Sequence, residues 1–260
     1  MRSGPILSCT PGDGLGNRFL VIEKSELDSI ELVMNEIAPQ LCGEIYDGVL
    51  VTDRTSENLV DVKIWNRDGS SGGACLNGLR VVAKWLGGKS GTFLMNGRQM
   101  TWRRVGAEIE LHLSGKDFPK DMELAMVVTS AGPGLSVPFW NPHCVVPVAN
   151  VDDVDLSTVA ASVRTAGIYF PDGANVEVVS EDGPGRVKMR VDERGIGETQ
   201  ACGSGAVAVA LSAWGGGLEG PLTVVMPGGT LRLCRAEDGG VKLRGEAKIG
   251  STESFPINLS

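Results

Sequence analysis

The sequence has no stretch approaching the roughly 20 consecutive apolar residues of a membrane-spanning helix. Its first residues also lack an apolar segment of signal-peptide length, so a cytoplasmic location is expected. Positive charge is in deficit as well: 24 Lys and Arg residues stand against 32 Asp and Glu, a net charge of −8. This balance argues against nucleic acid or an anionic membrane as the main partner. The hydrophobic fraction of 42% is ample for a packed core.

The cysteines include no Cys-x-x-Cys pair, so a zinc site has weak support and no metal is expected. In a cytoplasmic protein they should be reduced, and most are expected to be small buried hydrophobes. The question is which of them carry chemistry. The six are spread almost evenly along the chain: Cys9, Cys42, Cys75, Cys144, Cys202 and Cys234.

The stretch from 193 to 206 places Cys202 directly before a run of small residues, and an apolar segment ending at Trp214 follows. This pattern predicts a buried helix that begins next to the cysteine. Unpaired backbone N–H groups and the positive end of the helix dipole lower the pKa of a thiol at that place. Chemistry by a thiolate beside a bound anion and a buried structural thiol are both compatible with this stretch alone.

Glycine, with 36 residues, indicates many turns and short strands rather than a helical bundle. The glycine-rich segment 10–17 is expected to be a loop between strands. It is not a dinucleotide-binding loop, because a β-rich run follows where that motif requires a helix. Helices are predicted over 25–38 (ending before Pro39), 81–86, 155–166 and after Cys202. Strands are predicted over 6–9, 19–22, 48–52, 59–65, 92–95, 99–103, 108–113, 125–129, 144–148, 176–179 and 186–191, with several more between 222 and 257.

The two halves of the chain share a weak repeat. Asn66-Arg67 precedes Cys75 by the same offset as Glu193-Arg194 precedes Cys202, and an apolar helix follows each cysteine. Two similar halves would each present one cysteine at a helix N-terminus. Such a pair suits proton transfer at a carbon, since a thiolate can remove a proton while a thiol supplies one from the opposite face. A disulfide or redox switch is the rival interpretation of paired cysteines.

Five motifs, in order, resemble those of the diaminopimelate epimerase family, which acts without a cofactor. Segment 14–19 resembles the N-terminal Gly-Leu-Gly-Asn motif, and 66–80 resembles Asn-x-Asp-Gly-Ser followed by Cys-x-Asn-Gly-x-Arg. Segments 141–143 and 170–176 match the next two motifs. The most specific is 193–205, Glu-Arg-Gly-x-Gly-Glu-Thr-x-Ala-Cys-Gly-Ser-Gly. The resemblance covers most of the chain.

The resemblance implies a lysine and peptidoglycan-precursor isomerase that epimerises LL-2,6-diaminopimelate without pyridoxal phosphate. Cys75 and Cys202 would be the acid/base residues, with His143 in support. The expected fold is α+β: two similar domains related by a pseudo-two-fold axis, each a curved, mostly antiparallel sheet around a central helix. The expected domains are 1–117 and 118–248, with 249–260 returning to the first. The implied substrate-binding residues are Asn17, Asn66, Leu76, Asn77, Asn141, Asn175, Glu193, Arg194, Gly203 and Ser204.

The expected partner is a small amino-acid substrate, with a homodimer as an open alternative to a monomer. The departures from the family lie in the first half, where Leu76 replaces a glycine and Arg18 an aspartate; segments 44–48 and 71–73 also differ. These departures keep two alternatives open. One is a racemase of another amino acid, such as a basic one, and the other is a homologue that binds an amino acid without turning it over.

Overall fold

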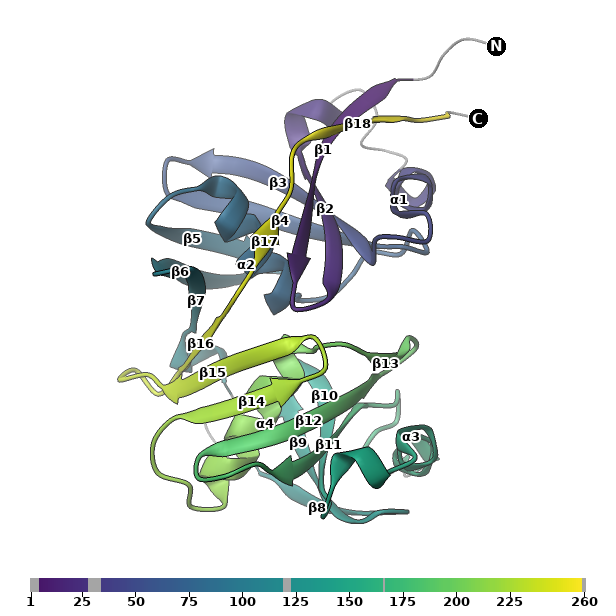
Figure 1. Ribbon diagram of the computed structural model, residues 1–260, viewed down its shortest axis with the longest axis vertical. Helices are drawn as coiled ribbons and strands as arrows, with labels where there is room; N and C mark the ends of the chain where they lie inside the picture. Colours follow the sequence, from purple (N-terminus) through teal and green to yellow (C-terminus); the bar gives the residue numbers. More distant parts are fainter. Residues whose placement is uncertain (1–4, 28–33, 119–122, 166, 259–260) are drawn as a thin grey trace. The chain divides into compact units, whose positions relative to one another are not determined.

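The computed structural model describes residues 5–27, 34–118, 123–165 and 167–258. The chain divides into two compact units. Unit 1 consists of Met1–Leu111 together with Glu246–Ser260, and unit 2 consists of His112–Gly245 (Figure 1). Within the described residues, no helix is long and apolar enough to cross a membrane.

Unit 1 is built from three antiparallel hairpins that join side by side through parallel pairings, β2 with β3 and β4 with β5. Helix α1 (Met34–Cys42) connects the first hairpin to the second, and helix α2 (Leu76–Leu86) connects the second to the third. The hairpins are β1 (Ile6–Gly14) with β2 (Asn17–Glu23), β3 (Gly48–Ser56) with β4 (Leu59–Asn66), and β5 (Ser90–Met95) with β6 (Arg98–Val105).

Unit 2 repeats this plan. Its hairpins join through the parallel pairings of β10 with β11 and β12 with β14, and helices α3 (Leu156–Thr165) and α4 (Gly203–Gly215) make the two connections. The repeated order of hairpin, helix, hairpin, helix and hairpin confirms the internal repeat expected from the sequence. The hairpins are β9 (Gly132–Phe139) with β10 (Asn141–Pro147), β11 (Asn175–Glu181) with β12 (Arg186–Glu193), and β14 (Leu222–Met226) with β15 (Gly229–Arg235).

The remaining elements extend the two sheets or connect them to the helices. In unit 1, the C-terminal strands β17 (Lys248–Ile249) and β18 (Glu253–Pro256) both pair with β1, so the end of the chain completes the sheet that its beginning starts. In unit 2, β8 extends the sheet beside β9, β13 lies against β12 and β16 lies against β15. These elements are β7 (Glu108–Leu113), β8 (Ala125–Thr129), β13 (Gly197–Thr199), β16 (Val241–Gly245), and the short helices η1 (Lys24–Leu27), η3 (Gly115–Asp117) and η4 (Val151–Asp153).

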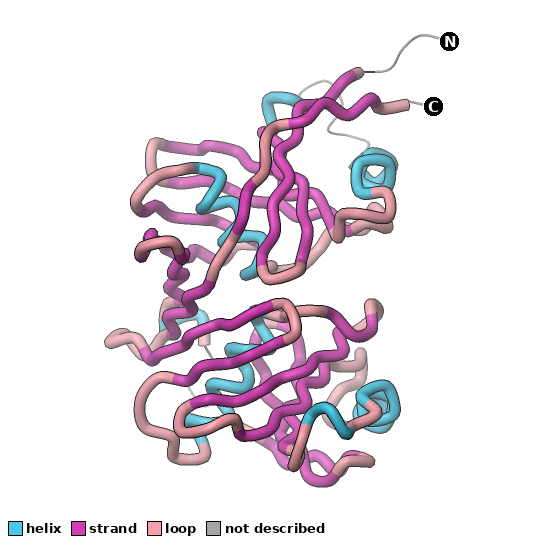
Figure 2. The backbone as a smooth tube through the Cα atoms, in the orientation of Figure 1, coloured by secondary structure: helices cyan, strands magenta, loops and turns pink. Residues whose placement is uncertain are grey.

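Each unit packs its two helices against the sheet in different ways. Helices α1 and α3 cover the core clusters around Ile37 and Val159, respectively. Helices α2 and α4 contact several strands of their own units and are the more deeply buried pair (Figure 2). Helix α4 is apolar on every side and is buried from Gly203 to Ala210, as expected for a helix inside a core. The predicted α+β class with a central helix in each unit is confirmed.

Two local predictions were wrong. The segment 10–17 is not a loop: most of it belongs to β1, where Pro11 pairs with Leu20 and its carbonyl accepts a hydrogen bond from the Gly250 N–H. The helix predicted to end before Pro39 continues to Cys42, and its start at 25 is a 3₁₀ turn, with 28–33 outside the described residues. Pro39 cannot donate to the Asn35 carbonyl, and loop residue Gly69 packs against that oxygen instead.

Candidate active site

The strand registers make the predicted site residues fall at equivalent places in the two units. Phe19 pairs with Gly48 in the parallel ladder of unit 1, and His143 pairs with Asn175 in that of unit 2. Asn17 and Asn141 therefore begin equivalent strands. In the same way, Asn66 and Glu193 end equivalent strands. The site residues thus follow the repeat of the fold rather than one local segment.

Cys75 and Cys202 have almost the same backbone geometry. Each is the N-cap of its helix, with φ and ψ of −128° and 95° for Cys75 and −127° and 115° for Cys202. Each Sγ accepts a hydrogen bond from the backbone N–H three residues later, at 3.3 Å from Gly78 and 3.4 Å from Gly205. The prediction that each half presents one cysteine at a helix N-terminus is confirmed.

The first turn of α2 carries a chain of polar side chains. Asn77 donates from Nδ2 to Oδ1 of Asn17 at 2.5 Å, and its own Oδ1 accepts a bond of 2.9 Å from Arg80. Leu76, the departure from the family pattern, is 2% exposed. At the end of β4, Asn66 donates to the Ser70 hydroxyl at 3.0 Å, which fixes a tight turn before the helix.

Cys202 lies in an acidic, buried environment. Burial raises the pKa of its thiol well above the ordinary value, and the negative charges of Glu193 and Glu177 raise it further. Hydrogen bonds from Ser204 and Gly205 act in the opposite direction without offsetting these effects. The backbone N–H at the helix N-terminus lowers the pKa of this thiol as expected, but desolvation and two carboxylates outweigh it, so the net shift is upward. Cys202 is a protonated thiol at neutral pH.

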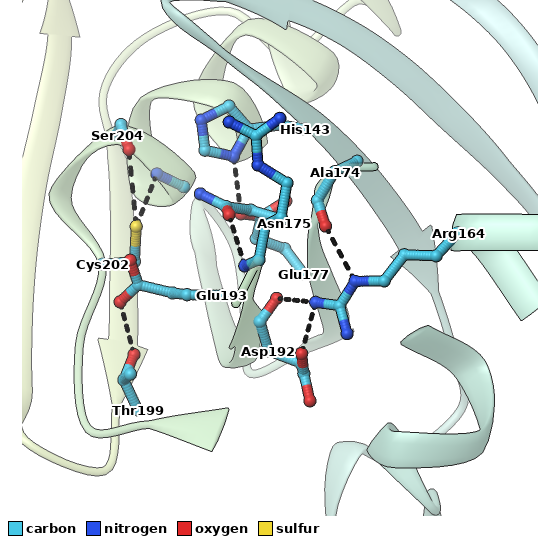
Figure 3. A network of polar contacts seen from close by, with 12 residues as sticks. His143, Arg164, Ala174, Asn175, Glu177, Asp192, Glu193, Thr199, Cys202 and Ser204 are labelled. Atoms are coloured by element: carbon cyan, nitrogen blue, oxygen red, sulfur yellow. Dashed lines mark hydrogen bonds and ion pairs between the residues drawn. The ribbon is translucent and has the colours of Figure 1, made fainter. Parts of the chain in front are cut away.

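Figure 3 shows Glu193 directed toward Cys202 and Thr199. The Thr199 hydroxyl donates to Oε1 of Glu193 at 2.6 Å. Burial is the main cause that raises the pKa of the Glu193 carboxyl, and Glu177 raises it too, while hydrogen bonds from Thr199 and Cys202 lower it. The Glu193 carboxylate is thus part of the environment of the thiol in this structure.

A fully buried pair lies beneath the start of α4. His143 Nδ1 and Glu177 Oε1 are 2.7 Å apart, and both side chains are 0% exposed. Among the described residues, neither His143 Nε2 nor Glu177 Oε2 has a hydrogen-bond partner. The equivalent positions in unit 1 are the apolar Phe19 and Leu50. A buried pair of polar, ionisable side chains at positions that the same fold fills with apolar side chains is costly to retain, which points to a functional role.

The ends of β11 and β12 are held by arginine. Oδ1 of Asn175 accepts a bond of 2.9 Å from the backbone N–H of Arg194. Arg164, on α3, donates to the carbonyls of Ala174 and Asp192 and to the Asp192 carboxylate, and these residues directly precede Asn175 and Glu193 (Figure 3). Arg164 therefore fixes the backbone on both sides of this end of the site.

Two of the predicted substrate-binding residues, Arg194 and Asn141, form few side-chain hydrogen bonds. The Arg194 side chain is exposed and donates to the Asp172 carbonyl at 2.9 Å. Asn141 begins β10 after Trp140, which has a positive φ of 51° at the tip of the β9–β10 hairpin. Its side chain has no hydrogen bond to any of the described residues. No group of three or more His, Cys, Asp or Glu side chains in the described ranges is arranged to hold a metal ion.

Comparison with known proteins identifies the family. The sequence profile of diaminopimelate epimerase matches residues 137–250. The chain is 34% identical to the diaminopimelate epimerase of Sphingopyxis alaskensis over 84% of its own length and 85% of the relative. It is 30% identical to that of Bacillus subtilis, over 90% and 93% of the two chains. The chain belongs to the diaminopimelate epimerase family. It is an isomerase with an epimerase function.

Solved structures agree with this fold. A phenazine biosynthesis PhzF family protein from Enterococcus faecalis is similar with a TM-score of 0.74 at 14% identity, over 97% of this chain and 100% of that one. A hydroxyproline epimerase from Agrobacterium vitis, solved with bound trans-4-hydroxy-L-proline, is similar with a TM-score of 0.65 at 12% identity, over 98% and 92% of the two chains. At such identities the likeness concerns the fold alone.

Sequence reasoning missed three residues that this member of the family places beside the site: Glu177, Thr199 and Arg164. A signal existed for Glu177, because it is the one charged residue in the buried run of β11 between Asn175 and Ser180. Thr199 and Arg164 carried no such signal. Their contacts depend on β13 folding back on β12 and on α3 packing over the sheet.

Proposed function

We propose that this protein converts LL-2,6-diaminopimelate to meso-diaminopimelate by proton transfer between two thiols and the α-carbon, without a cofactor. The observation that carries the proposal is the matched pair of N-cap cysteines, each with a glycine N–H directed at its sulfur. The family to which the chain belongs, and the names of its relatives, support the substrate.

The raised pKa of Cys202 supports one direction for the first transfer, with a protonated Cys202 as the acid and Cys75 as the thiolate base. The α-proton passes to Sγ of Cys75 while the Cys202 thiol delivers its proton to the opposite face of the same carbon. One C–H bond breaks and one forms, and proton exchange with solvent then restores the starting state. The mechanism requires both sulfurs to reach one α-carbon.

Charge that develops on the substrate carboxylate needs donors that are already in place. The backbone N–H groups at the starts of α2 and α4, at Leu76-Asn77 and Gly203-Ser204, are suited to this task because helix N-termini favour anions. Asn17 would line the substrate site, and five further residues would recognise the distal amino and carboxylate groups. They are Asn66, Asn141, Asn175, Glu193 and Arg194.

The test is solvent deuterium exchange into a panel of amino acids without pyridoxal phosphate. We expect exchange and epimerisation of LL-diaminopimelate, and roughly 10²–10⁴-fold losses of turnover for Cys75→Ala and for Cys202→Ala. Normal turnover by either variant would remove the two-thiol mechanism. Both variants should keep the circular dichroism of the unmodified protein, since each substitution replaces one small side chain.

A racemase of another amino acid, such as a basic one, is the second candidate. It is favoured by the altered lining of unit 1, where Arg67 forms an ion pair of 3.1 Å with Asp47 and Asp47 accepts a bond from the Arg18 N–H. Exchange into that amino acid with none into diaminopimelate would establish it. If no member of the panel exchanges while one binds, the protein is a non-catalytic homologue.

A further inference from the structure

Arg80 is a buried cation whose partners are all neutral. Its side chain is 0% exposed. The three guanidinium nitrogens donate to the carbonyls of Leu76 (3.3 Å) and Glu246 (3.5 Å) and to Oδ1 of Asn77 (2.9 Å). Among the described residues, no carboxylate forms an ion pair with it. Burial lowers the pKa of this guanidinium to about 10, so it stays charged at neutral pH.

Besides its burial, the position of Arg80 in the helix is unfavourable for a cation. It lies in the first turns of α2, close to the helix end that disfavours cations. The fold does not demand a cation there, because the equivalent position in α4, five residues after the N-cap cysteine, is Val207 with 0% exposure. A buried charge that opposes the helix dipole and that the sister unit replaces with valine needs an anion to balance it.

Two features of unit 1 indicate what Arg80 acts on. The first is its place beside Cys75: Nη1 of Arg80 donates to the carbonyl of Leu76, the residue that follows the N-cap Cys75, and a Cys75 thiolate would attract this cation. The second feature is the direction of the amides. Because a guanidinium only donates, it holds Oδ1 of Asn77 toward itself, and Nδ2 of Asn77 then donates to Oδ1 of Asn17. Asn17 is left with its N–H donors, which have no partner within the described ranges.

We propose that Arg80 is a positioning residue of the active site: its charge balances the Cys75 thiolate, and its hydrogen bond to Asn77 sets Asn17 to present N–H donors to an anionic group of the substrate. The second part rests on the proposed function; the first does not. Unit 2 has the opposite arrangement, with carboxylates near Cys202 and valine in place of the arginine. In this proposal, unit 1 favours an ionised thiol at Cys75 and unit 2 favours a protonated thiol at Cys202.

The test compares Arg80→Lys, which keeps the charge, with Arg80→Gln, which removes it and keeps a donor. The full chain is treated with limiting iodoacetamide at pH 7.5, and the modification rate of each cysteine is read by peptide mass spectrometry. Only the thiolate attacks, forming the S–C bond and releasing iodide, so the rate reports the ionised fraction. We expect Cys75 to react about two- to fivefold more slowly in Arg80→Gln, as for a pKa rise of about one unit in a thiol that is at least half ionised at this pH, and at close to the rate of the unmodified protein in Arg80→Lys. Half-buried Cys234 is the reference thiol and should not change.

An unchanged Cys75 rate in a folded Arg80→Gln variant would overturn the proposal. If that variant does not fold, Asn77→Asp serves instead: a carboxylate beside the guanidinium neutralises Arg80 without removing it, and Cys75 should again react more slowly. A parental rate in Asn77→Asp would then refute the proposal. With diaminopimelate, Arg80→Gln should raise KM as well as lower kcat, since Asn17 is released. A wild-type protein inactive on every amino acid would refute the proposed function while leaving the alkylation result standing.

Discussion

Gly205 and Gly78 occupy equivalent places in α4 and α2. Replacing each with alanine tests whether the hydrogen bond between His143 and Glu177 prevents the Glu177 side chain from moving. A Cβ at Gly205 would lie 2.6 Å from Oε1 of Glu177. A Cβ at Gly78 would lie 2.9 Å from a methyl group of Leu50. Both substitutions gain the same helix propensity and insert the same methyl group. They differ in what must move.

At Gly205, the Glu177 carboxylate must retreat by about 0.8 Å to reach an ordinary contact of about 3.4 Å, and its bond to His143 holds it at 2.7 Å. Overpacking should lower the unfolding free energy by about 1–3 kcal/mol at both sites. At Gly205 we also expect the loss of the hydrogen bond between Glu177 and His143, which is charge-assisted and contributes about 1.5–3 kcal/mol. Gly205→Ala should therefore lose about 1.5–3 kcal/mol more unfolding free energy than Gly78→Ala.

Urea denaturation of both variants beside the unmodified protein measures the difference, with the slope checked for constancy so that midpoints can be compared. Equal losses at the two glycines would refute the reasoning, because they would show that Glu177 can swing aside as freely as a leucine. A Gly205→Ala/Glu177→Gln double variant is the control. The neutral amide is held less tightly by His143, so the extra loss should shrink.

Two further outcomes follow from the electrostatics. Glu177→Gln removes one of the two carboxylates that raise the pKa of Cys202, so this pKa should fall and carbamidomethylation of Cys202 at pH 8 should accelerate several-fold by peptide mapping; an unchanged rate would assign the raised pKa to burial and Glu193. At the start of α3, hydrogen bonds from Ser157 and Thr158 hold the pKa of Asp155 at about 2. The stabilisation from this lowered pKa is complete above the unfolded pKa of about 3.9 and is lost as the pH falls through about 2. In urea titrations, Asp155→Ala should therefore be less stable than the unmodified protein at pH 7. Near pH 2 the two proteins should have the same stability.

Much of this fold could be predicted because its signals are local. The alternation of residues 59–65 predicted β4, and the apolar run after Cys202 predicted α4. The shared offsets before Cys75 and Cys202 predicted a repeat, which the strand registers extend to Asn17 with Asn141 and Asn66 with Glu193. Motif spacing carried this information because both copies keep the same strand and helix order.

The electrostatics of the site could not be predicted, because they depend on contacts between segments distant in the chain. Glu177 reaches the start of α4 from β11, and burial of Cys202, together with the charges of Glu193 and Glu177, reverses the pKa shift that the helix end alone would give. Pro39 was interpreted as a helix end, yet its missing N–H is tolerated because Gly69 packs against the carbonyl it leaves free. Propensity rules consider only residues close in the sequence, so they include neither Glu177 as a neighbour of α4 nor Gly69 as a neighbour of α1.

The pairing of β1 with β17 and β18 also determines the order in which the chain can fold during synthesis. All strands of unit 2 leave the ribosome before residue 246, whereas the sheet of unit 1 lacks two of the strands beside β1 until residues 248–256 have emerged. Unit 2 can therefore complete its fold first, against the usual N-terminal-first order. Until then the edge of β1 that later pairs with β17 and β18 stays unpaired, which exposes it to chaperones and to misassembly.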